Sequence, residues 1–214
     1  MKTIYFVRHG ESEGNAGPIR QKADSLLTEK GRYQSAFVAE RCSKLNIDTV
    51  VCSTMDRAKE TAQIIIDKTS KPVEYSNLFA ERRRSSEVLG KPKDSPVALK
   101  AEKKIIENFH IPGFRFSDEE NFEDLKERAK KALEYLSRRP EDNVLVITHG
   151  FFMRIIMAYV VFGDKLTGEE CNRFIRVFHM ENTGITVLLY DEEYKDYPWW
   201  LWIWNDHTHL GEVG

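Results

Sequence analysis

The sequence has few cysteines and no long hydrophobic run. Cys42, Cys52 and Cys171 are widely spaced and form no C-x-x-C pair, which argues against a disulfide framework and against a zinc site. We expect them to be small buried residues in a reducing compartment. The most apolar segment, residues 151–162, is shorter than the roughly 20 residues that cross a bilayer. We therefore predict a soluble, cytoplasmic protein without a membrane partner.

The chain also lacks an excess of charge of either sign. Lysine and arginine total 32 and aspartate and glutamate 34, for a formal charge of −2. This balance gives no overall attraction to nucleic acid, and no basic tract or glycine-rich nucleotide loop is present. With 12 glycines, 7 prolines and 41% hydrophobic residues, the composition is that of a folded protein. A length of 214 residues favours one domain, spanning 1–214.

Short β-branched runs alternate with segments of helical periodicity. The strands are expected at 3–7, 49–52, 73–75, 143–148 and 183–190, and a further run at 199–204 would complete a terminal hairpin. Helices are expected from residue 28, from residue 53, over 120–139 and over 151–162. Such alternation predicts an α/β three-layer sandwich, with a mostly parallel central sheet and helices on both faces.

Capping and periodicity give finer expectations for three of the helices. Thr28 is a suitable N-cap for the first, whose apolar residues Tyr33, Ala36 and Phe37 share one face. Ser53 and Asp56 have the spacing of a capping box for the second. The helix at 151–162 is apolar nearly all round, which predicts a central helix covered by its neighbours.

The segment 85–118 does not follow the alternation. Prolines bound a short helical pattern in which Ala98, Ala101, Ile105 and Phe109 lie on one face. A helical excursion between a strand and a long helix is a natural small lid over the strand ends. The alternative is a surface insertion without a functional part.

Ionisable residues follow three of the expected strands. Arg8 and His9 come at the end of the first strand, His149 at the end of the strand 143–148, and Arg57 just after the strand 49–52. Parallel strands of an open sheet bring their carboxyl ends to one edge, where ligands bind. Four such groups would repel one another unless an anion joined them. A phosphoryl group fits, since arginine matches phosphate oxygens, and the helix that begins near Gly150 would add backbone N–H groups.

The motifs around these residues resemble those of the histidine phosphatase superfamily, the phosphoglycerate-mutase-like proteins. Val7–Ser12 with Asn15 is similar to its Arg-His-Gly signature, and 53–62 and 148–150 are similar to its second and third signatures. The helix start at 27–34 and the C-terminal pattern at 182 and 204–210 match as well. The resemblance covers nearly the whole chain and is loosest over 85–118. The segment 19–28 is closer to the phosphatase members than to the mutases.

This resemblance implies a mechanism. His9 would be the nucleophile that forms a phosphohistidine, while Arg8, Arg57 and His149 hold the phosphoryl oxygens. His9 must be neutral at its attacking nitrogen, and we expect a backbone carbonyl near Gly10 to orient it; His149 would work best as a protonated donor. By family analogy Glu81 would be the general acid, with Glu87 as the fallback.

The remaining candidates are expected to bind the substrate. Asn15, and less securely Ser12, would line the phosphate site together with Gly150. Arg82 could reach a second anionic group of the substrate, whereas Arg83 and Arg84 are expected in a solvated basic turn. His207 and His209 make a poor metal site, and His110 and His179 have no companions in the sequence.

The sequence thus predicts a phosphomonoester hydrolase that needs no metal or other cofactor and acts on a small phosphorylated metabolite. The first alternative is a phosphoglycerate mutase, in which the phosphoenzyme transfers its group to a sugar acid. A non-catalytic phospho-ligand binding module is the second. No nucleic-acid partner is expected, and both a monomer and a homodimer remain open.

Overall fold

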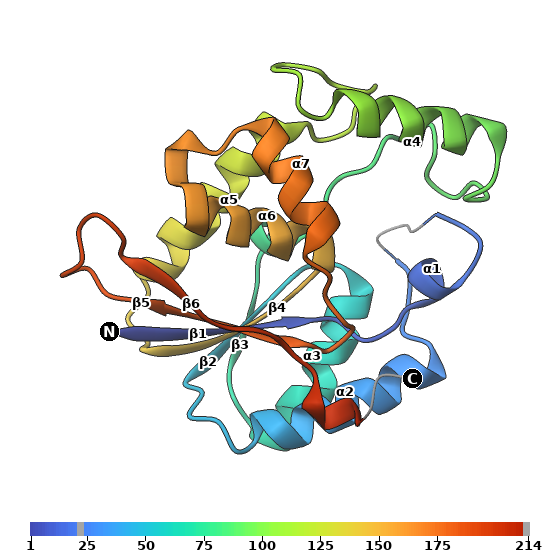
Figure 1. Ribbon diagram of the computed structural model, residues 1–214. Coiled ribbons are helices and arrows are strands. Elements are labelled where there is room, and N and C mark those ends of the chain that lie inside the picture. The colour runs from blue at the N-terminus through green and yellow to red at the C-terminus, as the bar shows by residue number, and fades with distance from the viewer. Residues whose placement is uncertain (21–23, 212–214) are drawn as a thin grey trace.

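A six-stranded sheet forms the middle layer of the computed structural model, which describes residues 1–20 and 24–211 (Figure 1). Its strands are β1 (Lys2–Arg8), β2 (Thr49–Cys52), β3 (Val73–Tyr75), β4 (Asn143–Thr148), β5 (Ile185–Tyr190) and β6 (Trp199–Asp206). The order is β3-β2-β4-β1-β5-β6. The first four are parallel, and β5 and β6 pair in antiparallel fashion at one side. The predicted sheet and its terminal hairpin are confirmed.

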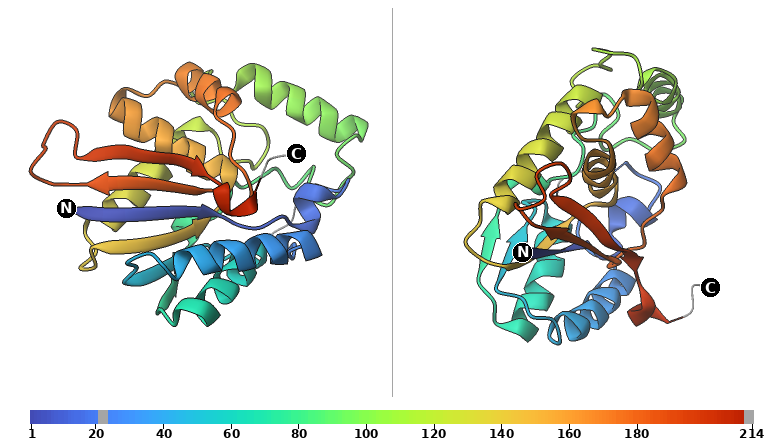
Figure 2. Two further views of the ribbon diagram at one scale, coloured as in Figure 1. Left: turned by 60° about the horizontal axis from the view of Figure 1, so that its bottom comes forward. Right: turned by 60° about the vertical axis from the view of Figure 1, so that its left-hand side comes forward.

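Helices cover both faces of this sheet. They are α1 (Glu13–Ala16), α2 (Glu29–Cys42), α3 (Asp56–Thr69), α4 (Pro96–Asn108), α5 (Phe122–Ser137), α6 (Gly150–Phe162) and α7 (Gly168–Val177). Figures 1 and 2 show α2 and α3 below the sheet and α5, α6 and α7 above it. The three-layer architecture is therefore as predicted, although α7 was not predicted from the sequence.

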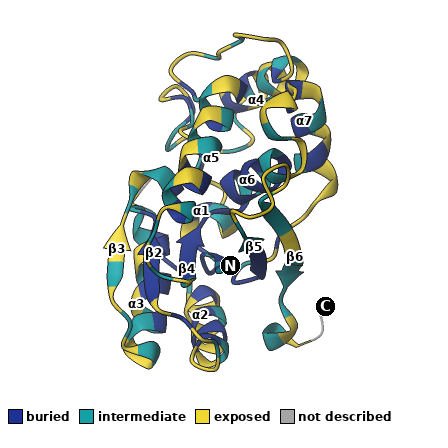
Figure 3. Ribbon diagram, turned by 90° about the vertical axis from the view of Figure 1, so that its left-hand side faces the viewer, coloured by how far each residue is buried: buried dark blue, intermediate teal, exposed yellow. Residues whose placement is uncertain are grey.

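Two hydrophobic cores lie on the two sides of the sheet. Ile4 and Phe6 of β1 belong to the core beneath α5, α6 and α7, and Val7 belongs to the core above α2 and α3. Successive side chains of a strand point to opposite faces, so one short apolar strand contributes to both cores. The strands in the middle of the sheet are accordingly buried, and the exposed residues gather on the outer helix faces (Figure 3).

The N-cap of α2 is confirmed, but the expected buried face is wrong. Thr28 Oγ1 accepts a hydrogen bond of 3.0 Å from the Gly31 amide. Tyr33 and Phe37 are 62% and 56% exposed, and Ala36 is exposed beside them. The buried face instead begins at Gly31, where an added Cβ would lie 1.9 Å from the carbonyl oxygen of Glu11. Close approach of the loop after β1 therefore decides the orientation of the helix.

The expected capping box of α3 is also wrong. The helix begins at Asp56 with Met55 as N-cap and no side-chain cap. Ser53 lies two residues before this N-cap, and its hydroxyl contacts a histidine described below. The expectation for α6 is confirmed: Phe152, Met153 and Ile156 are buried, and α5 and α7 pack beside the helix.

Aromatic packing joins the antiparallel strands to the helical layer. The Trp204 ring of β6 lies 6.1 Å from Phe174 and 5.2 Å from Phe178, measured between centroids. Trp202 of the same strand is 70% exposed. Among the described residues, no helix is both long and apolar enough to cross a membrane.

The segment 85–118 carries α4 and lies next to the loop after β1 (Figure 1). Ala98, Ala101 and Phe109 are buried, as the periodicity predicted. The Arg20 amide donates to the Lys91 carbonyl oxygen at 2.9 Å, so the two segments are hydrogen-bonded to each other. Residues 21–23 of the phosphatase-like segment 19–28 lie outside the described residues.

Candidate active site

Neighbouring parallel strands bring the two histidines together. In the register of β1 with β4, Arg8 is opposite Thr148. His9 and His149, the residues that directly follow these two strands, therefore lie side by side. Their ring centroids are 5.0 Å apart. β2 pairs with the other side of β4 and leads into α3, which carries Arg57 in its first turn. The structure thus brings together the residues that the strand ends predicted to converge.

Hydrogen bonds fix the tautomer of His9. Its Nδ1 lies 2.6 Å from the Gly10 carbonyl oxygen, and since a carbonyl only accepts, Nδ1 carries the proton. Arg57 Nε donates to His9 Nε2 at 3.2 Å, so Nε2 presents its lone pair. The backbone carbonyl expected near Gly10 is therefore that of Gly10 itself. His9 is a neutral imidazole with an unprotonated Nε2.

The surroundings of His9 keep it neutral. Burial, followed by the nearby His149 ring and the charges of Arg57 and Arg8, lowers the pKa of His9 well below 6.5. The hydrogen bond to Gly10 acts in the opposite direction but is the weaker influence. A neutral imidazole is the form that can act as a nucleophile.

His149 is buried and neutral in the ligand-free protein. Burial, followed by Arg57, Arg128 and Arg8, lowers its pKa well below 6.5. Its Nε2 lies 2.7 Å from the Ser53 hydroxyl, while its Nδ1 is buried without a hydrogen-bond partner among the described residues. The Ser53 oxygen also accepts from the Met55 amide at 3.3 Å, and its own hydrogen is available for donation to Nε2. The proton of a neutral His149 would then be on Nδ1.

Gly150 gives Arg8 its space. A Cβ on Gly150 would lie 3.0 Å from Arg8 Nε, an atom that is buried without a hydrogen-bond partner within the described chain. Arg8 Nη1 donates to the carbonyl oxygen of Met180, which holds the guanidinium in place. Both Arg8 and Gly150 line the cavity beside His9.

The N-terminus of α6, beside His149, binds the carboxylate of Glu81. The amides of Phe151 and Phe152 donate to Glu81 at 3.3 and 3.1 Å, and the Arg82 amide donates at 2.9 Å. The expectation that these helix amides are free for a bound phosphoryl group is corrected by this arrangement. Burial raises the pKa of Glu81, but the Arg82 amide and the charges of Arg57 and Arg84 lower it further than burial raises it.

Asn15 lies at the mouth of the same site. Its Oδ1 accepts from both the amide and the hydroxyl of Ser12, at 2.7 and 2.5 Å. This leaves its amide nitrogen directed toward Asn182, 3.5 Å away, whose own amide donates to the His9 carbonyl. Asn15 lines the cavity, whereas Ser12 is fully buried and orients it.

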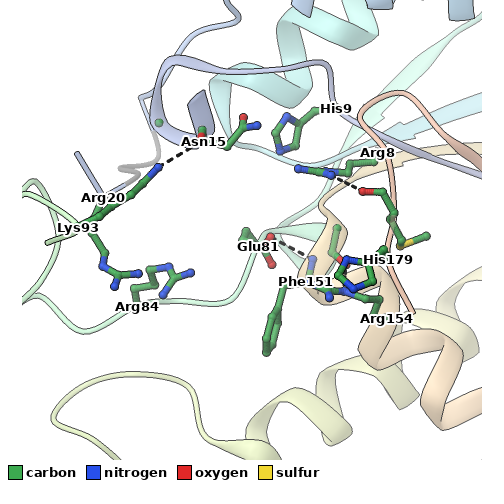
Figure 4. A pocket seen from close by; sticks show the side chains of 13 residues that line it. Arg8, His9, Asn15, Arg20, Glu81, Arg84, Lys93, Phe151, Arg154 and His179 are labelled. Atoms are coloured by element: carbon green, nitrogen blue, oxygen red, sulfur yellow. Dashed lines mark hydrogen bonds between the residues drawn. The ribbon is translucent and has the colours of Figure 1, made fainter. Parts of the chain in front are cut away.

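A cavity of about 340 Å³ lies beside His9 (Figure 4), and Arg57 and His149 contact its surroundings without being part of its lining. Its lining is strongly cationic and includes residues from loops far apart in the sequence: Arg8, His9, Gly14, Asn15, Arg20, Glu81, Arg84, Lys93, Gly150, Phe151, Arg154, His179 and Met180. Sequence reasoning missed Arg20, Lys93 and Arg154 and treated His179 as ordinary. A cationic cavity that contains a neutral nucleophilic imidazole is suited to reaction with an anionic electrophile.

The three consecutive arginines have different surroundings. Arg82 does not line the His9 cavity: its Nε lies 3.1 Å from buried Glu119, and its guanidinium lies over the Phe151 ring. Arg83 is exposed, as expected. The prediction for Arg84 is wrong, because it lines the cavity, and burial with the charges of Arg82 and Arg20 lowers its pKa to about 10. In an irregular segment no periodicity shows which arginine points inward.

The lesser candidates lie elsewhere. Glu87 is exposed and outside the cavity lining. His209 Nε2 lies 3.0 Å from the Thr183 hydroxyl near the end of the described chain. Over residues 1–20 and 24–211, no three His, Cys, Asp or Glu residues are grouped as a metal would require.

Matches to known proteins span nearly the whole chain. A probable phosphoglycerate mutase GpmB from Serratia proteamaculans is 31% identical over 220 residues, which cover 98% of this chain and 95% of the relative. The solved structure of Bacillus stearothermophilus YhfR superposes with a TM-score of 0.80 at 25% identity, covering 98% of this chain and 100% of that one. A mycobacterial glucosyl-3-phosphoglycerate phosphatase gives 0.78 at 21% identity, with coverage of 96% and 100%. The family model of the histidine phosphatase superfamily, branch 1, matches residues 4–206, and the chain belongs to this superfamily.

Proposed function

We propose that the protein is a phosphomonoester hydrolase that works through a phosphohistidine on His9. The observation that carries the proposal is the hydrogen bonding of this ring. Gly10 holds the proton on Nδ1, and Arg57 approaches Nε2, so the lone pair of Nε2 faces a cationic environment. An incoming phosphoryl group would meet a neutral nucleophile and a positive charge together.

In the first step, the Nε2 lone pair forms a bond to phosphorus while the bond from phosphorus to the ester oxygen breaks. Arg8, Arg57 and Asn15 would hold the phosphoryl oxygens, and His149 would donate from Nδ1. Positioned donors of this kind supply most of the catalysis of phosphoryl transfer. A neutral His149 with its proton on Nδ1 can serve as this donor without being protonated further.

Glu81 would supply the proton that the departing oxygen needs. In the ligand-free protein its pKa is lowered, so it is a carboxylate at neutral pH. A bound phosphoryl group adds negative charge beside it, which favours its protonated form. In the second step, water attacks phosphorus, Glu81 accepts a proton from that water, and phosphate leaves with His9 restored.

The second candidate is phosphoglycerate mutase activity. It is supported by the name of curated relatives such as the Serratia proteamaculans protein, a probable phosphoglycerate mutase. The chemistry at His9 would be the same, but the phosphoryl group would pass to a hydroxyl of a sugar acid instead of water. The fate of the phosphoenzyme is therefore what distinguishes the two functions.

The experiment begins with an aryl phosphate in the presence of a chelator. We expect turnover by the wild type, a mass increase corresponding to one phosphoryl group on the quenched protein, and loss of both in His9→Ala. His110→Ala, which changes an exposed histidine outside the cavity, is the matched control. Undiminished turnover by His9→Ala would overturn the mechanism, and loss of wild-type turnover on chelation would overturn the metal-free reaction.

Product analysis then separates the two functions. With 3-phosphoglycerate as substrate, we expect the hydrolase to release inorganic phosphate and glycerate. Conversion to the 2-phospho isomer without release of phosphate would instead identify a mutase.

A further inference from the structure

The cavity has a second cationic wall that the proposed reaction does not use. Arg20, Arg84 and Lys93 lie together on one side of it, and Arg8, Arg154 and His179 lie on the other (Figure 4). We propose that Arg20, Arg84 and Lys93 bind a second anionic group of the substrate, a carboxylate or a second phosphate. The inference rests on the proposed function and narrows its substrates to phosphomonoesters with two anionic groups.

Arg20 is the best-defined member of this wall. Its side chain is only 8% exposed although it lines the cavity. One end of the guanidinium is held by Glu102 of α4 at 2.6 Å, while Nε is buried without a hydrogen-bond partner among the described residues. A buried guanidinium N–H without an acceptor is costly. An oxyanion in the cavity would provide that acceptor.

The Lys93 ammonium is held in place by neutral carbonyl oxygens and so keeps its full positive charge. It donates to the carbonyl oxygens of Asn15 and Gly17, at 3.1 and 2.5 Å. An ammonium group has three hydrogens, so these two bonds leave one for a ligand. Because Asn15 also borders the phosphoryl site, this contact sets the position of Lys93 relative to the reacting phosphorus.

The charge of the cavity exceeds what one phosphoryl group can neutralise. The lining contains five cationic side chains, Arg8, Arg20, Arg84, Lys93 and Arg154, and one carboxylate, Glu81. Three backbone amides already bind that carboxylate. A phosphoryl group brings about 1.5 to 2 negative charges. Positive charge therefore remains, and most of it is on the wall opposite Arg8.

The cations of this wall are close enough to repel one another. Burial, followed by Arg82 and Arg20, lowers the pKa of Arg84 to about 10, so Arg84 stays protonated at neutral pH. Burial, followed by Arg20 and Arg84, lowers the pKa of Lys93. Glu102, which pairs with Arg20, is 46% exposed, and the charges of Glu119 and Glu81 oppose the lowering of the Arg84 pKa without cancelling it. An anion placed between the three groups would relieve the repulsion.

The volume of the cavity is also large enough for a second anionic group. Liquid water occupies about 30 Å³ per molecule, so a cavity of about 340 Å³ has room for roughly ten water-sized groups. This is more than the oxygens of one phosphoryl group require. The extra room extends toward the segment 85–118, to which Lys93 and α4 belong. This position also differs from the one expected from the sequence, in which Arg82 was to reach the second anion.

The test compares matched substrates that differ by one anionic group. Phosphoglycolate is compared with ethylene glycol monophosphate, and propanediol bisphosphate with propanediol monophosphate. We expect the wild type to favour at least one of the two-anion substrates by tenfold or more in kcat/KM. Arg84→Gln and Arg20→Gln should each reduce this preference about tenfold, corresponding to about 1.4 kcal/mol. The pair that shows the preference tells whether the second cationic wall binds a carboxylate or a phosphate.

Arg83→Gln is the matched control, because Arg83 is adjacent in sequence but exposed. It should leave the preference unchanged. Equal activity of the wild type on both members of each pair would overturn the proposal, as would an equal loss on both in Arg84→Gln. Failure of the proposed function looks different: neither member of either pair would be hydrolysed. In that case, calorimetric titration of His9→Ala with phosphonoacetate and methylphosphonate still measures the preference, and equal binding of the two would overturn the second site.

Discussion

The two walls of the cavity differ in how the chain builds them. The wall around His9 comes from residues at and just after the ends of β1 and β4, and Arg57 in the first turn of α3 donates a hydrogen bond to His9. The sheet fixes the register of these regular elements. The opposite wall comes from Arg20, Arg84 and Lys93, which lie in irregular segments. The proposed chemistry would thus depend on the sheet, and the proposed selectivity would depend on loops, which tolerate change more readily.

Glu81 lies between the two walls, and its substitution should have the largest effect. In the proposed mechanism Glu81→Gln removes the proton donor for the departing oxygen, so we expect kcat for an alkyl phosphate to fall about 10²- to 10⁴-fold. The fall should be much smaller for a nitrophenyl phosphate, whose leaving group needs no proton. Steady-state kinetics with both esters checks this. If Glu87→Gln shows the loss instead, the acid is Glu87.

Arg57 tests the wall around His9. Arg57→Ala should lower kcat/KM about 10²- to 10³-fold for one-anion and two-anion substrates alike, because it removes a buried donor beside the reacting phosphorus. Arg57→Lys should recover little, since an ammonium cannot reproduce the fork of a guanidinium. Kinetics on the matched pairs gives the measurement. A loss of kcat/KM confined to two-anion substrates would contradict the assignment of Arg57 to the reacting phosphoryl group and of the other wall to the second anion.

The pKa of His9 gives a third, smaller effect. A lowered pKa means that the ring stays neutral as the pH falls through 6.5 and gains a proton only well below it. Histidine signals followed by NMR should therefore show His9 titrating well below pH 6.5, with the signal assigned through His9→Ala. A midpoint near 6.5 would show that neither burial nor the neighbouring cations lower the pKa of this ring.

The smallest effect is expected outside both walls. Thr28→Ala removes the side-chain cap of α2, which should lower the free energy of unfolding by about 1 kcal/mol. Denaturant unfolding measures this change, with the exposed Lys44→Ala as the control. The kcat/KM of the folded enzyme should not change, and a large kinetic effect would mean that α2 positions the catalytic residues more directly than its packing indicates.

Regular structure made much of the fold and inner site predictable from sequence. The parallel sheet and the meeting of His9 with His149 at its edge were predicted from apolar strands that end in polar residues, whereas the strand order was not predicted. Ser53 was misjudged for a physical reason: a serine before a helix is a common cap, but here a nearby histidine takes its hydroxyl. Periodicity also identified the shared face of Tyr33 and Phe37, but not that a loop already occupied the opposite side of the helix.

The sequence contained no comparable pattern for the second cationic wall. Which of Arg82, Arg83 and Arg84 points into the cavity depends on how Glu119 and Phe151 position Arg82, and both belong to distant segments. Arg20 and Lys93 meet only because the loop after β1 is hydrogen-bonded to the segment 85–118. Such contacts are tertiary and leave no periodic pattern in the sequence.

The pairing of β1 with β4 also has a consequence for how the protein becomes active. His9 is made early in synthesis, but the strand that carries its partner follows some 135 residues later, and β5 closes the other side of β1 later still. Contacts of such long sequence separation form slowly and late in folding. The proposed activity would therefore report on completion of the sheet, and a partly synthesised or partly folded chain would carry His9 without the partners that the proposed reaction needs.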